Sequence, residues 1–282
     1  MSSEKGPATT SGVVSFLVPP ADPTLKLYLH VNADAATGEA PHNYTREDRH
    51  ITIENVRGKE DSVTLDTAGF QFFNAPSQYK AFANDEEIKK IYYPESIELI
   101  KKLTGASRVE LFDHTVRRRV PGQLDDSPDK RQPVPQAHVD QTTRSSIARV
   151  HRHLPEADAP ELLKKRFQII NLWRPIANPA WDYPLALCDY RSVNPEKDTV
   201  PVALVYPERE GETMGVKYSD NYKWKYLYGM TPDEIVLIKC FDSVQDGSVA
   251  VFTPHTAFED PATPKGAPHR QSIELRALVF YD

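Results

Sequence analysis

The sequence of 282 residues predicts a mainly β protein with flanking helices. Short runs in which apolar and polar residues alternate recur from Val13 to Tyr281, and turn-forming residues separate them. One stretch, 85–103, instead carries apolar residues at helical spacing. We therefore expect strands to form the core and helices to cover one outer face of a sheet.

The first half of the chain opens with small polar residues at 1–12, which we expect to be flexible. A single domain is expected over 13–282. Strands are expected at 13–18, 25–31, 51–56, 62–65 and 70–73. Two consecutive helices are expected over 85–103, with a break at Pro94 and an end at Gly105.

The second half returns mostly to strands. They are expected at 108–112, 167–176, 181–193, 234–242, 249–252 and 272–281, with a mostly helical stretch at 141–166. Three arginines, 117–119, follow the first of these strands, and a solvated strand end is favoured over an anion-binding patch. Residues 121–135 are rich in proline and charge, which predicts either an active-site lid or a surface insertion.

Composition excludes some classes of function. The net charge is −6, which disfavours a dedicated nucleic-acid binder, because such proteins neutralise phosphates. The chain has no secretory signal pattern and no apolar run of membrane-spanning length, so we expect a cytosolic protein that does not associate with membranes. Cys188 and Cys240 lie in no metal-binding pattern and are expected to be reduced thiols in the core.

The motif QAHVDQTT at 136–143 places His138 and Asp140 two residues apart. In a strand these side chains point to the same face, so they could hold one metal ion together. His255 ends a strand-like run and is the candidate for a second imidazole ligand. Two imidazoles and one carboxylate with open positions are typical of non-haem Fe(II) oxygenases.

Alternatives to this metal site stay open on the sequence alone. A triplet of histidine, any residue and an acid arises by chance in a chain of this composition, and a motif is only a hypothesis. His151 and His153 form a rival pair, but they lie in a charged, helix-like stretch where a solvated face is favoured. His255 could instead be a buried histidine bonded to the backbone.

A candidate carboxylate anchor opens the final strand. Arg270 and Ser272 lie two apart and could offer a guanidinium and a hydroxyl to one carboxylate, as the distal end of 2-oxoglutarate would require. Arg276 shares their strand face and is the alternative anchor. Pairing of Arg270 with Glu274 at the surface is the competing structural explanation.

Four sequence blocks resemble a known family: NLWRPIANPAWDYPLALCDYRSV, DEIVLIKCFDS, TPHTAFEDP and HRQSIELRALVF. They are similar to the hydroxylase/desaturase family that includes fungal AsaB-like proteins and the CmcJ protein of cephamycin biosynthesis. This family is a branch of the non-haem Fe(II)/2-oxoglutarate-dependent oxygenases of specialised metabolism. The resemblance extends over about residues 10–282 and is strongest from residue 108 onward.

The resemblance implies a double-stranded β-helix, a cupin-like jelly-roll whose open mouth holds the metal. It implies that Fe(II) is held by His138, Asp140 and His255, and that 2-oxoglutarate and O2 complete the metal's coordination. Arg270 with Ser272 would anchor the distal carboxylate of 2-oxoglutarate.

Three further residues, Asn171, Trp173 and Arg174, would line or brace the mouth, although Arg174 could instead pair with Asp182 or Asp189. The long span between Asp140 and His255 would contribute to the substrate pocket.

The implied activity is hydroxylation or desaturation of a small-molecule natural product. Endoperoxidation, isomerisation or ring rearrangement at the same iron site is an alternative, as is a non-catalytic jelly-roll that partners an active paralogue. Both a homodimer and a heterodimer stay open.

Overall fold

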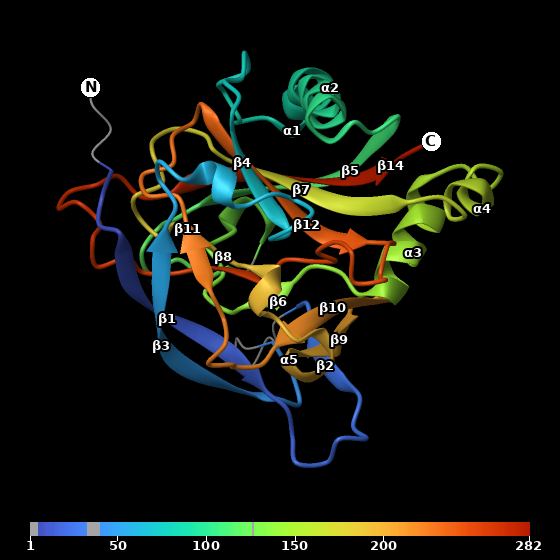
Figure 1. Ribbon diagram of the computed structural model, residues 1–282, viewed down its shortest axis with the longest axis horizontal. Coiled ribbons are helices and arrows are strands. Elements are labelled where there is room, and N and C mark those ends of the chain that lie inside the picture. Colours follow the sequence, from blue (N-terminus) through green and yellow to red (C-terminus); the bar gives the residue numbers. More distant parts are fainter. Residues whose placement is uncertain (1–4, 33–39, 126) are drawn as a thin grey trace.

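The computed structural model describes residues 5–32, 40–125 and 127–282, and within them the chain forms two β-sheets (Figure 1). The five-stranded sheet has the order β4 (Phe70–Asn74), β12 (Glu234–Asp242), β7 (Phe167–Pro175), β14 (Gln271–Phe280), β5 (Arg108–Arg118). The nine-stranded sheet has the order β1 (Thr9–Val18), β3 (Thr45–Asn55), β11 (Trp224–Tyr226), β8 (Leu185–Cys188), β13 (His255–Ala257), β6 (His138–Val139), β10 (Glu210–Val216), β9 (Thr199–Val205), β2 (Leu27–His30). The mainly β prediction is confirmed.

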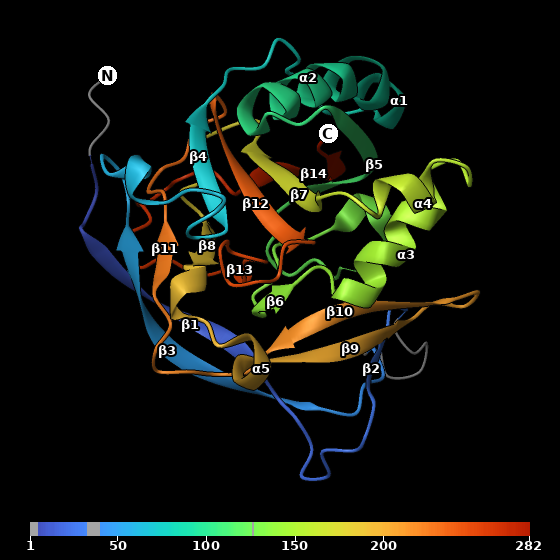
Figure 2. The same ribbon diagram turned by 45° about the vertical axis from the view of Figure 1, so that its right-hand side comes forward.

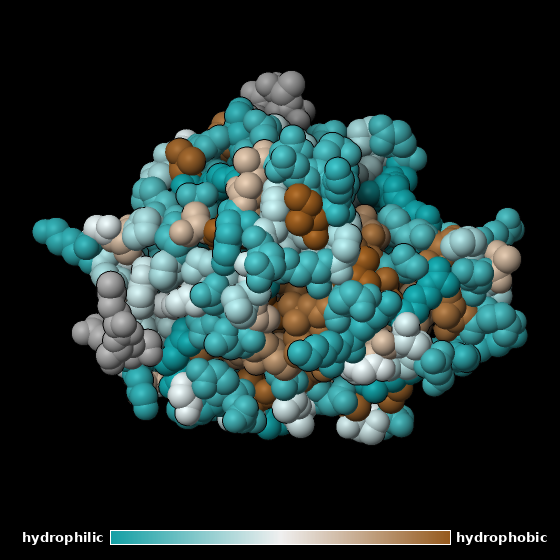
Figure 3. All heavy atoms as spheres, turned by 90° about the horizontal axis from the view of Figure 1, so that it is seen from above, coloured by the Kyte–Doolittle hydropathy of each residue, from teal (hydrophilic) through white to brown (hydrophobic). Residues whose placement is uncertain are grey.

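Helices cover the outer face of the five-stranded sheet, as predicted. Figures 1 and 2 show α2 (Tyr93–Thr104) above this sheet, on the side away from the nine-stranded sheet. The surface on the α2 side is mostly hydrophilic, with smaller apolar patches (Figure 3). A buried side chain of α2, Ile100, packs in one cluster with Leu172 of β7 and Leu275 of β14. The apolar stripe of the helix thus buries the outer face of the sheet.

The helical segment differs from its prediction in one detail. The expected break at Pro94 is wrong, because α1 (Asp85–Glu87), a π-helix (Ile88–Tyr92) and α2 follow one another without a gap. Pro94 lies in the first turn of α2, where a missing N–H is tolerated. The helix ends as predicted at Gly105, which has a φ of 74° and caps it in the left-handed conformation.

Alternation along the central strands separates two cores. On β14 the odd-numbered residues 273–279 pack toward α2, whereas Leu278 and Phe280 pack between the sheets. On β7, likewise, Leu172 faces α2 and Trp173 faces the opposite sheet. Even positions of β14 and odd positions of β7 therefore share the space between the sheets, where the candidate site lies.

The remaining helical elements are short. They are η1 (Glu60–Ser62), η3 (Pro128–Lys130), α3 (Thr143–His153), α4 (Ala159–Leu162), η4 (Tyr190–Ser192) and α5 (Pro195–Asp198). None of the helices in the described ranges is long and apolar enough to span a membrane. Cys188 and Cys240 are free and buried, as expected.

Several expected boundaries are wrong. The strand expected at 62–65 is instead the end of η1 and a turn, and the strand expected at 249–252 is irregular backbone that leads into β13. The strand expected at 181–193 is shortened to β8. Residues 9–12 belong to β1 and pair with β3, so the expectation of flexibility is wrong for them, and residues 1–4 lie outside the described residues.

Candidate metal centre

The two candidate histidines meet at the centre of the nine-stranded sheet. β6 and β13 are antiparallel neighbours, and His255 lies directly opposite His138 in their register. The two imidazole rings are 4.5 Å apart between centroids. Asp140 follows β6 immediately and is two residues from His138. Short strands thus place ligands from distant parts of the chain side by side.

Asp140 faces both imidazoles. Its Oδ1 lies 3.3 Å from Nε2 of His138 and 3.7 Å from Nε2 of His255. One potential ligand atom from each of the three residues lies within 4.8 Å of the others. The predicted convergence of the three side chains is therefore observed.

Backbone carbonyls orient both rings. Nδ1 of His138 lies 2.9 Å from the carbonyl oxygen of Gln136, and Nδ1 of His255 lies 3.0 Å from that of Thr253. In the neutral form of each ring, Nδ1 therefore carries the proton and donates it, and the lone pair is on Nε2. A histidine that binds a metal through one ring nitrogen usually donates a hydrogen bond from the other, as these Nδ1 atoms do.

Two side chains from the five-stranded sheet hold the other oxygen of Asp140. Its Oδ2 accepts a hydrogen bond of 2.7 Å from Nδ2 of Asn171 and one of 3.2 Å from Nε of Arg276. Asn171 on β7 and Arg276 on β14 are paired in register, so both strands act on the same carboxylate. Oδ1 is left to face the imidazoles, which suits a ligand that binds through one oxygen.

The charges at the centre favour a cation. Burial opposes ionisation of Asp140, but Arg276 and the two imidazoles outweigh it and hold its pKa well below the ordinary value. Burial and the neighbouring His138 lower the pKa of His255. For His138, burial is outweighed by its contact with Asp140, and its pKa is raised. An ionised carboxylate beside a neutral imidazole is a donor set that fits a divalent metal.

A small cavity of about 90 Å³ opens beside the three residues and extends to Arg270. Nη1 of Arg270 donates to the carbonyl of Tyr183 at 2.6 Å, and its guanidinium carbon lies 5.5 Å from the ring centroid of Trp173. Its Nε is buried and has no hydrogen-bond partner among the described residues. Burial and nearby Arg117 lower the pKa of Arg270 to about 9. Within the described ranges, no carboxylate forms an ion pair with this buried guanidinium.

The other anchor candidates are placed differently. Arg276 is already engaged by Asp140, Asp113 and Glu274. Ser272 is buried on the strand face of Arg270, but it is not among the residues that line the small cavity. The competing pairing of Arg270 with Glu274 is not observed among the described residues, because Glu274 pairs with Arg276 instead.

The expectation that Arg174 lines or braces the mouth is wrong. Its side chain points to the outer face of the sheet, where Nε donates to the hydroxyl of Tyr92 at 2.8 Å. Nη1 donates to the carbonyls of Ala75 and Pro232, each at 2.7 Å. The alternative pairing with Asp182 or Asp189 is also not found. Its neighbour Trp173 faces the cavity, because adjacent strand residues point to opposite faces.

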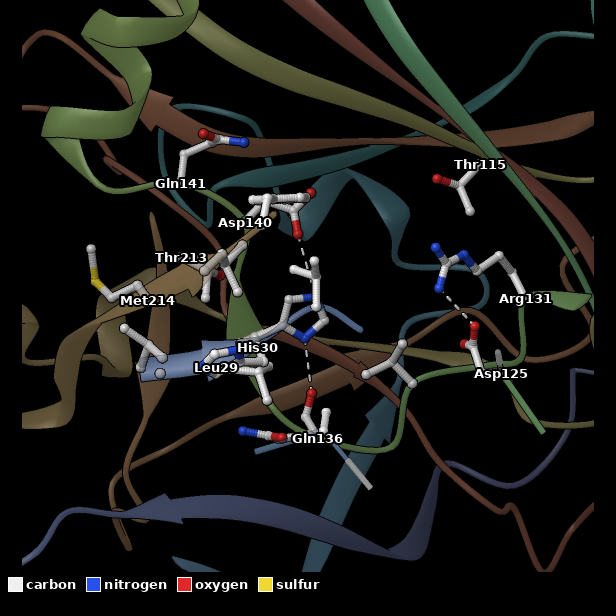
Figure 4. A pocket seen from close by; sticks show the side chains of 18 of the residues that line it. Leu29, His30, Thr115, Asp125, Arg131, Gln136, Asp140, Gln141, Thr213 and Met214 are labelled. Atoms are coloured by element: carbon white, nitrogen blue, oxygen red, sulfur yellow. Dashed lines mark hydrogen bonds and ion pairs between the residues drawn. The ribbon is translucent and has the colours of Figure 1, made fainter. Parts of the chain in front are cut away.

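A larger cavity of about 480 Å³ adjoins His138 and Asp140 (Figure 4). Figure 4 shows Leu29 and Met214 on one side of it, and Asp125 with Arg131 on the other. Arg131 donates to Asp125 at 2.9 Å. Asp125 and Arg131 belong to the proline-rich segment, so this segment forms a wall of the cavity, as a lid would. Met214 lies in the long span before His255, which therefore contributes to the pocket.

Sequence reasoning missed Arg117. The expectation of a solvated strand end is wrong for this residue, whose side chain is 19% exposed and lines both cavities. Its Nη1 donates to the carbonyl of Gln132 at 2.7 Å. In the rival pair, His153 stacks on Phe112 at 4.9 Å and belongs to no metal-ligating cluster among the described residues.

Comparison with known proteins gives consistent matches. A family model described as "Oxidoreductase/YMDC permease-like domain" matches residues 14–280. Hydroxylase/desaturase efuI of Hormonema carpetanum is 34% identical over 94% of this chain and 96% of that protein. Fe(II)/2-oxoglutarate-dependent dioxygenase nvfI of Aspergillus novofumigatus is 31% identical over 94% of each chain.

A solved structure extends the similarity to three dimensions. The structure of the iron and alpha-ketoglutarate-dependent endoperoxidase NvfI superposes with a TM-score of 0.85 at 28% identity, and the match covers 97% of this chain and 98% of that one. The jelly-roll fold and the family resemblance predicted from the sequence are confirmed.

Proposed function

Because this chain belongs to the hydroxylase/desaturase family of Fe(II)/2-oxoglutarate-dependent dioxygenases, we propose that it oxidises a small-molecule natural product in specialised metabolism. The reaction is hydroxylation or desaturation, and it consumes 2-oxoglutarate and O2. The observation that carries the proposal is the convergence of two Nε2 atoms and one carboxylate oxygen beside a cavity that ends in a buried, unpaired arginine nitrogen.

His138, Asp140 and His255 would hold the iron. The carbonyls of Gln136 and Thr253 fix the tautomers of the two histidines, and Asn171 with Arg276 fixes the orientation of Asp140. A ligand set that is oriented before the metal arrives loses little conformational freedom on binding.

Arg270 is the proposed anchor for the distal carboxylate of 2-oxoglutarate. Its Nε is buried without a hydrogen-bond partner among the described residues, and the carboxylates that line the same cavity, those of Asp140 and Glu274, pair with Arg276 instead. Arg276 is excluded from this role by its three acidic partners, and Ser272 is retained as a second donor to the same carboxylate. Trp173 packs beside Arg270 and excludes water from the ion pair, which strengthens it.

When bound, Fe(II) and 2-oxoglutarate would activate O2, the oxidant that breaks an unactivated C–H bond. The protein binds both partners, keeps the small cavity dry and presents the substrate from the larger cavity. His138 and Asp140 line both cavities, so a substrate in the larger one lies next to the metal.

Anaerobic addition of Fe(II) and 2-oxoglutarate tests this function. The wild type should give the visible charge-transfer band of a chelated iron complex, and admission of O2 with substrate should yield succinate. Asp140→Ala and His255→Ala should lose the band. His153→Ala is the matched control, because it removes another partly buried histidine outside the cluster and should keep the band. A band of wild-type strength in both ligand variants would contradict the assignment.

A second candidate reaction is endoperoxidation at the same iron site. The observation in its favour is the close superposition with NvfI, an iron and alpha-ketoglutarate-dependent endoperoxidase. Isomerisation and ring rearrangement would use the same residues. Mass analysis of the product after reaction under labelled O2 distinguishes them, since an endoperoxide retains two atoms of one O2 molecule and a hydroxyl retains one.

The proposal also covers the location and the partners of the protein. A non-catalytic role beside an active paralogue is disfavoured by the complete ligand set. We propose a cytosolic enzyme that acts on a small molecule, with no nucleic-acid or membrane partner. Cell fractionation tests the location. Light scattering of the purified chain distinguishes a monomer from a homodimer, and co-purification of a second chain tests a heterodimer.

A further inference from the structure

The acidic groups that line the cavity of about 480 Å³ are all in contact with arginines or belong to the candidate metal centre. Asp113 contacts Arg276, Asp125 contacts Arg131 and Arg117, and Asp140 belongs to the candidate metal centre. No described carboxylate of this cavity is therefore left to attract a cationic substrate.

A second cavity of about 490 Å³ adjoins the first, and both are lined by Asp140, Arg149, Leu204 and Tyr206. Its other two acidic residues, Glu210 and Glu212, are also engaged, because both contact Arg144. The two cavities thus share a wall that contains both the candidate metal ligand Asp140 and Arg149.

Three arginines of this second cavity have no acidic partner among the described residues: Arg149, Arg152 and Arg209. Arg149 lies over the ring of Phe112 at 5.2 Å, and Arg209 lies over the ring of Tyr206 at 3.6 Å. Ring contacts position a guanidinium but leave its donors unused. Burial, together with the neighbouring arginines, lowers the pKa of Arg149, as expected where positive charge is not compensated.

Apolar side chains supply the rest of the binding surface. Leu204 lies between the two cavities, and Leu29, Val202 and Met214 line the first. A ligand that fills this space would bury apolar area near the metal and place a polar end at Arg149.

From this arrangement we propose that the substrate is an organic acid with an apolar skeleton, whose carboxylate is bound by Arg149 while the carbon to be oxidised lies beside His138 and Asp140. Arg152 and Arg209 attract the anion at the mouth of the second cavity. The proposal rests on the function proposed above and adds the chemical class of the substrate. A guanidinium pairs with a carboxylate through two parallel hydrogen bonds, so Arg149 would both select and orient the substrate.

The test compares acids with their uncharged amides. Calorimetric titration under anaerobic conditions uses the enzyme with Fe(II) and saturating 2-oxoglutarate. The probes are decanoate, 2-naphthoate and 4-biphenylcarboxylate, and each acid is compared with its own primary amide. Decyl phosphate is titrated as a separate probe. The wild type should bind at least one acid about tenfold to a hundredfold more tightly than its amide, as a charged hydrogen-bond pair requires. Arg149→Gln should remove this preference, and Arg149→Lys should keep part of it.

Arg46→Gln is the matched control. Arg46 also lies over an aromatic ring, that of Tyr44 at 5.8 Å, but it lines neither cavity, so the preference should persist. Equal binding of acids and amides by the wild type, absence of binding by every acid, or a stronger preference for decyl phosphate would overturn the proposal. An acid that displaces 2-oxoglutarate, seen as loss of the charge-transfer band, would also overturn it, because it would lie at Arg270.

The two proposals fail separately. If the band never forms but acids still bind through Arg149, the iron function is wrong and the anion site stands. If the band forms and acids show no preference over amides, the iron function stands and the substrate class is wrong.

Discussion

Replacing Asn171 by leucine tests how the sheet supports the metal ligand. Asn171 is fully buried, and its Nδ2 donates to Oδ2 of Asp140 at 2.7 Å. Leucine has the same number and branching of side-chain heavy atoms but no donor, so Asp140 keeps only Arg276 on that oxygen. A hydrogen bond to a charged group contributes about 1.5–3 kcal/mol, which corresponds to roughly a tenfold to a hundredfold change in an equilibrium constant. We expect the Kd for Fe(II) to rise by this factor.

The control lies on the same strand. Gln168 is also buried in β7, and its Nε2 donates to Oδ2 of Asp242 at the same distance, 2.7 Å. Gln168→Leu should therefore reduce stability by a comparable amount without changing the affinity for iron. Both variants would be titrated anaerobically with Fe(II) against a competing chelator, and their unfolding by urea would be measured. An unchanged Kd in a folded Asn171→Leu protein would refute the reasoning.

Three further perturbations follow from the described contacts. Arg270→Gln should raise the KM for 2-oxoglutarate about tenfold to a hundredfold and leave the Kd for Fe(II) unchanged, as steady-state kinetics and metal titration would show; an unchanged KM would contradict the anchor. Asp242→Asn should lower the free energy of unfolding by about 3–5 kcal/mol in urea, because Lys239 is 0% exposed and would lose a buried partner. Burial raises the pKa of Asp242, but its cationic neighbours outweigh that effect and the pKa is lowered. Its contribution is therefore complete above its unfolded pKa of about 4 and is lost as the pH falls through the lower folded value, so this variant should show a flatter dependence of stability on pH below about 4. Gly69→Ala should weaken both folding and iron binding, since an added Cβ would lie 2.3 Å from Oγ1 of Thr253, whose carbonyl orients His255; wild-type iron affinity in that variant would contradict the link.

Local sequence patterns were sufficient for two of the three residues of the candidate centre. A histidine and an aspartate two residues apart on a strand must share a face, so the position of Asp140 relative to His138 follows from strand geometry. His255 could be named as a candidate because it ends a strand-like run, but its place depends on the pairing of β13 with β6, and no local pattern specifies that pairing. The family resemblance implied the same three residues.

Other features could not be predicted because their signals are non-local. Strand β7 is buried on both faces, so the apolar pattern does not indicate which of Trp173 and Arg174 faces the cavity. Arg117 resembles a solvated strand end in sequence, but the segment 121–135 covers it. The hairpin of β9 and β10 was missed, since Pro201 in β9 and glycines in β10 weaken the strand signal.

The order of synthesis gives the ligand arrangement a further consequence. His138 and Asp140 leave the ribosome together, but His255 follows 115 positions after Asp140, behind the strands that form much of both sheets. Until those strands fold, the third ligand is tethered by a long flexible loop, and closing that loop carries an entropic cost. A nascent chain therefore offers iron only two donors. Tight binding of a metal by all three residues is therefore expected only when the polypeptide is nearly finished.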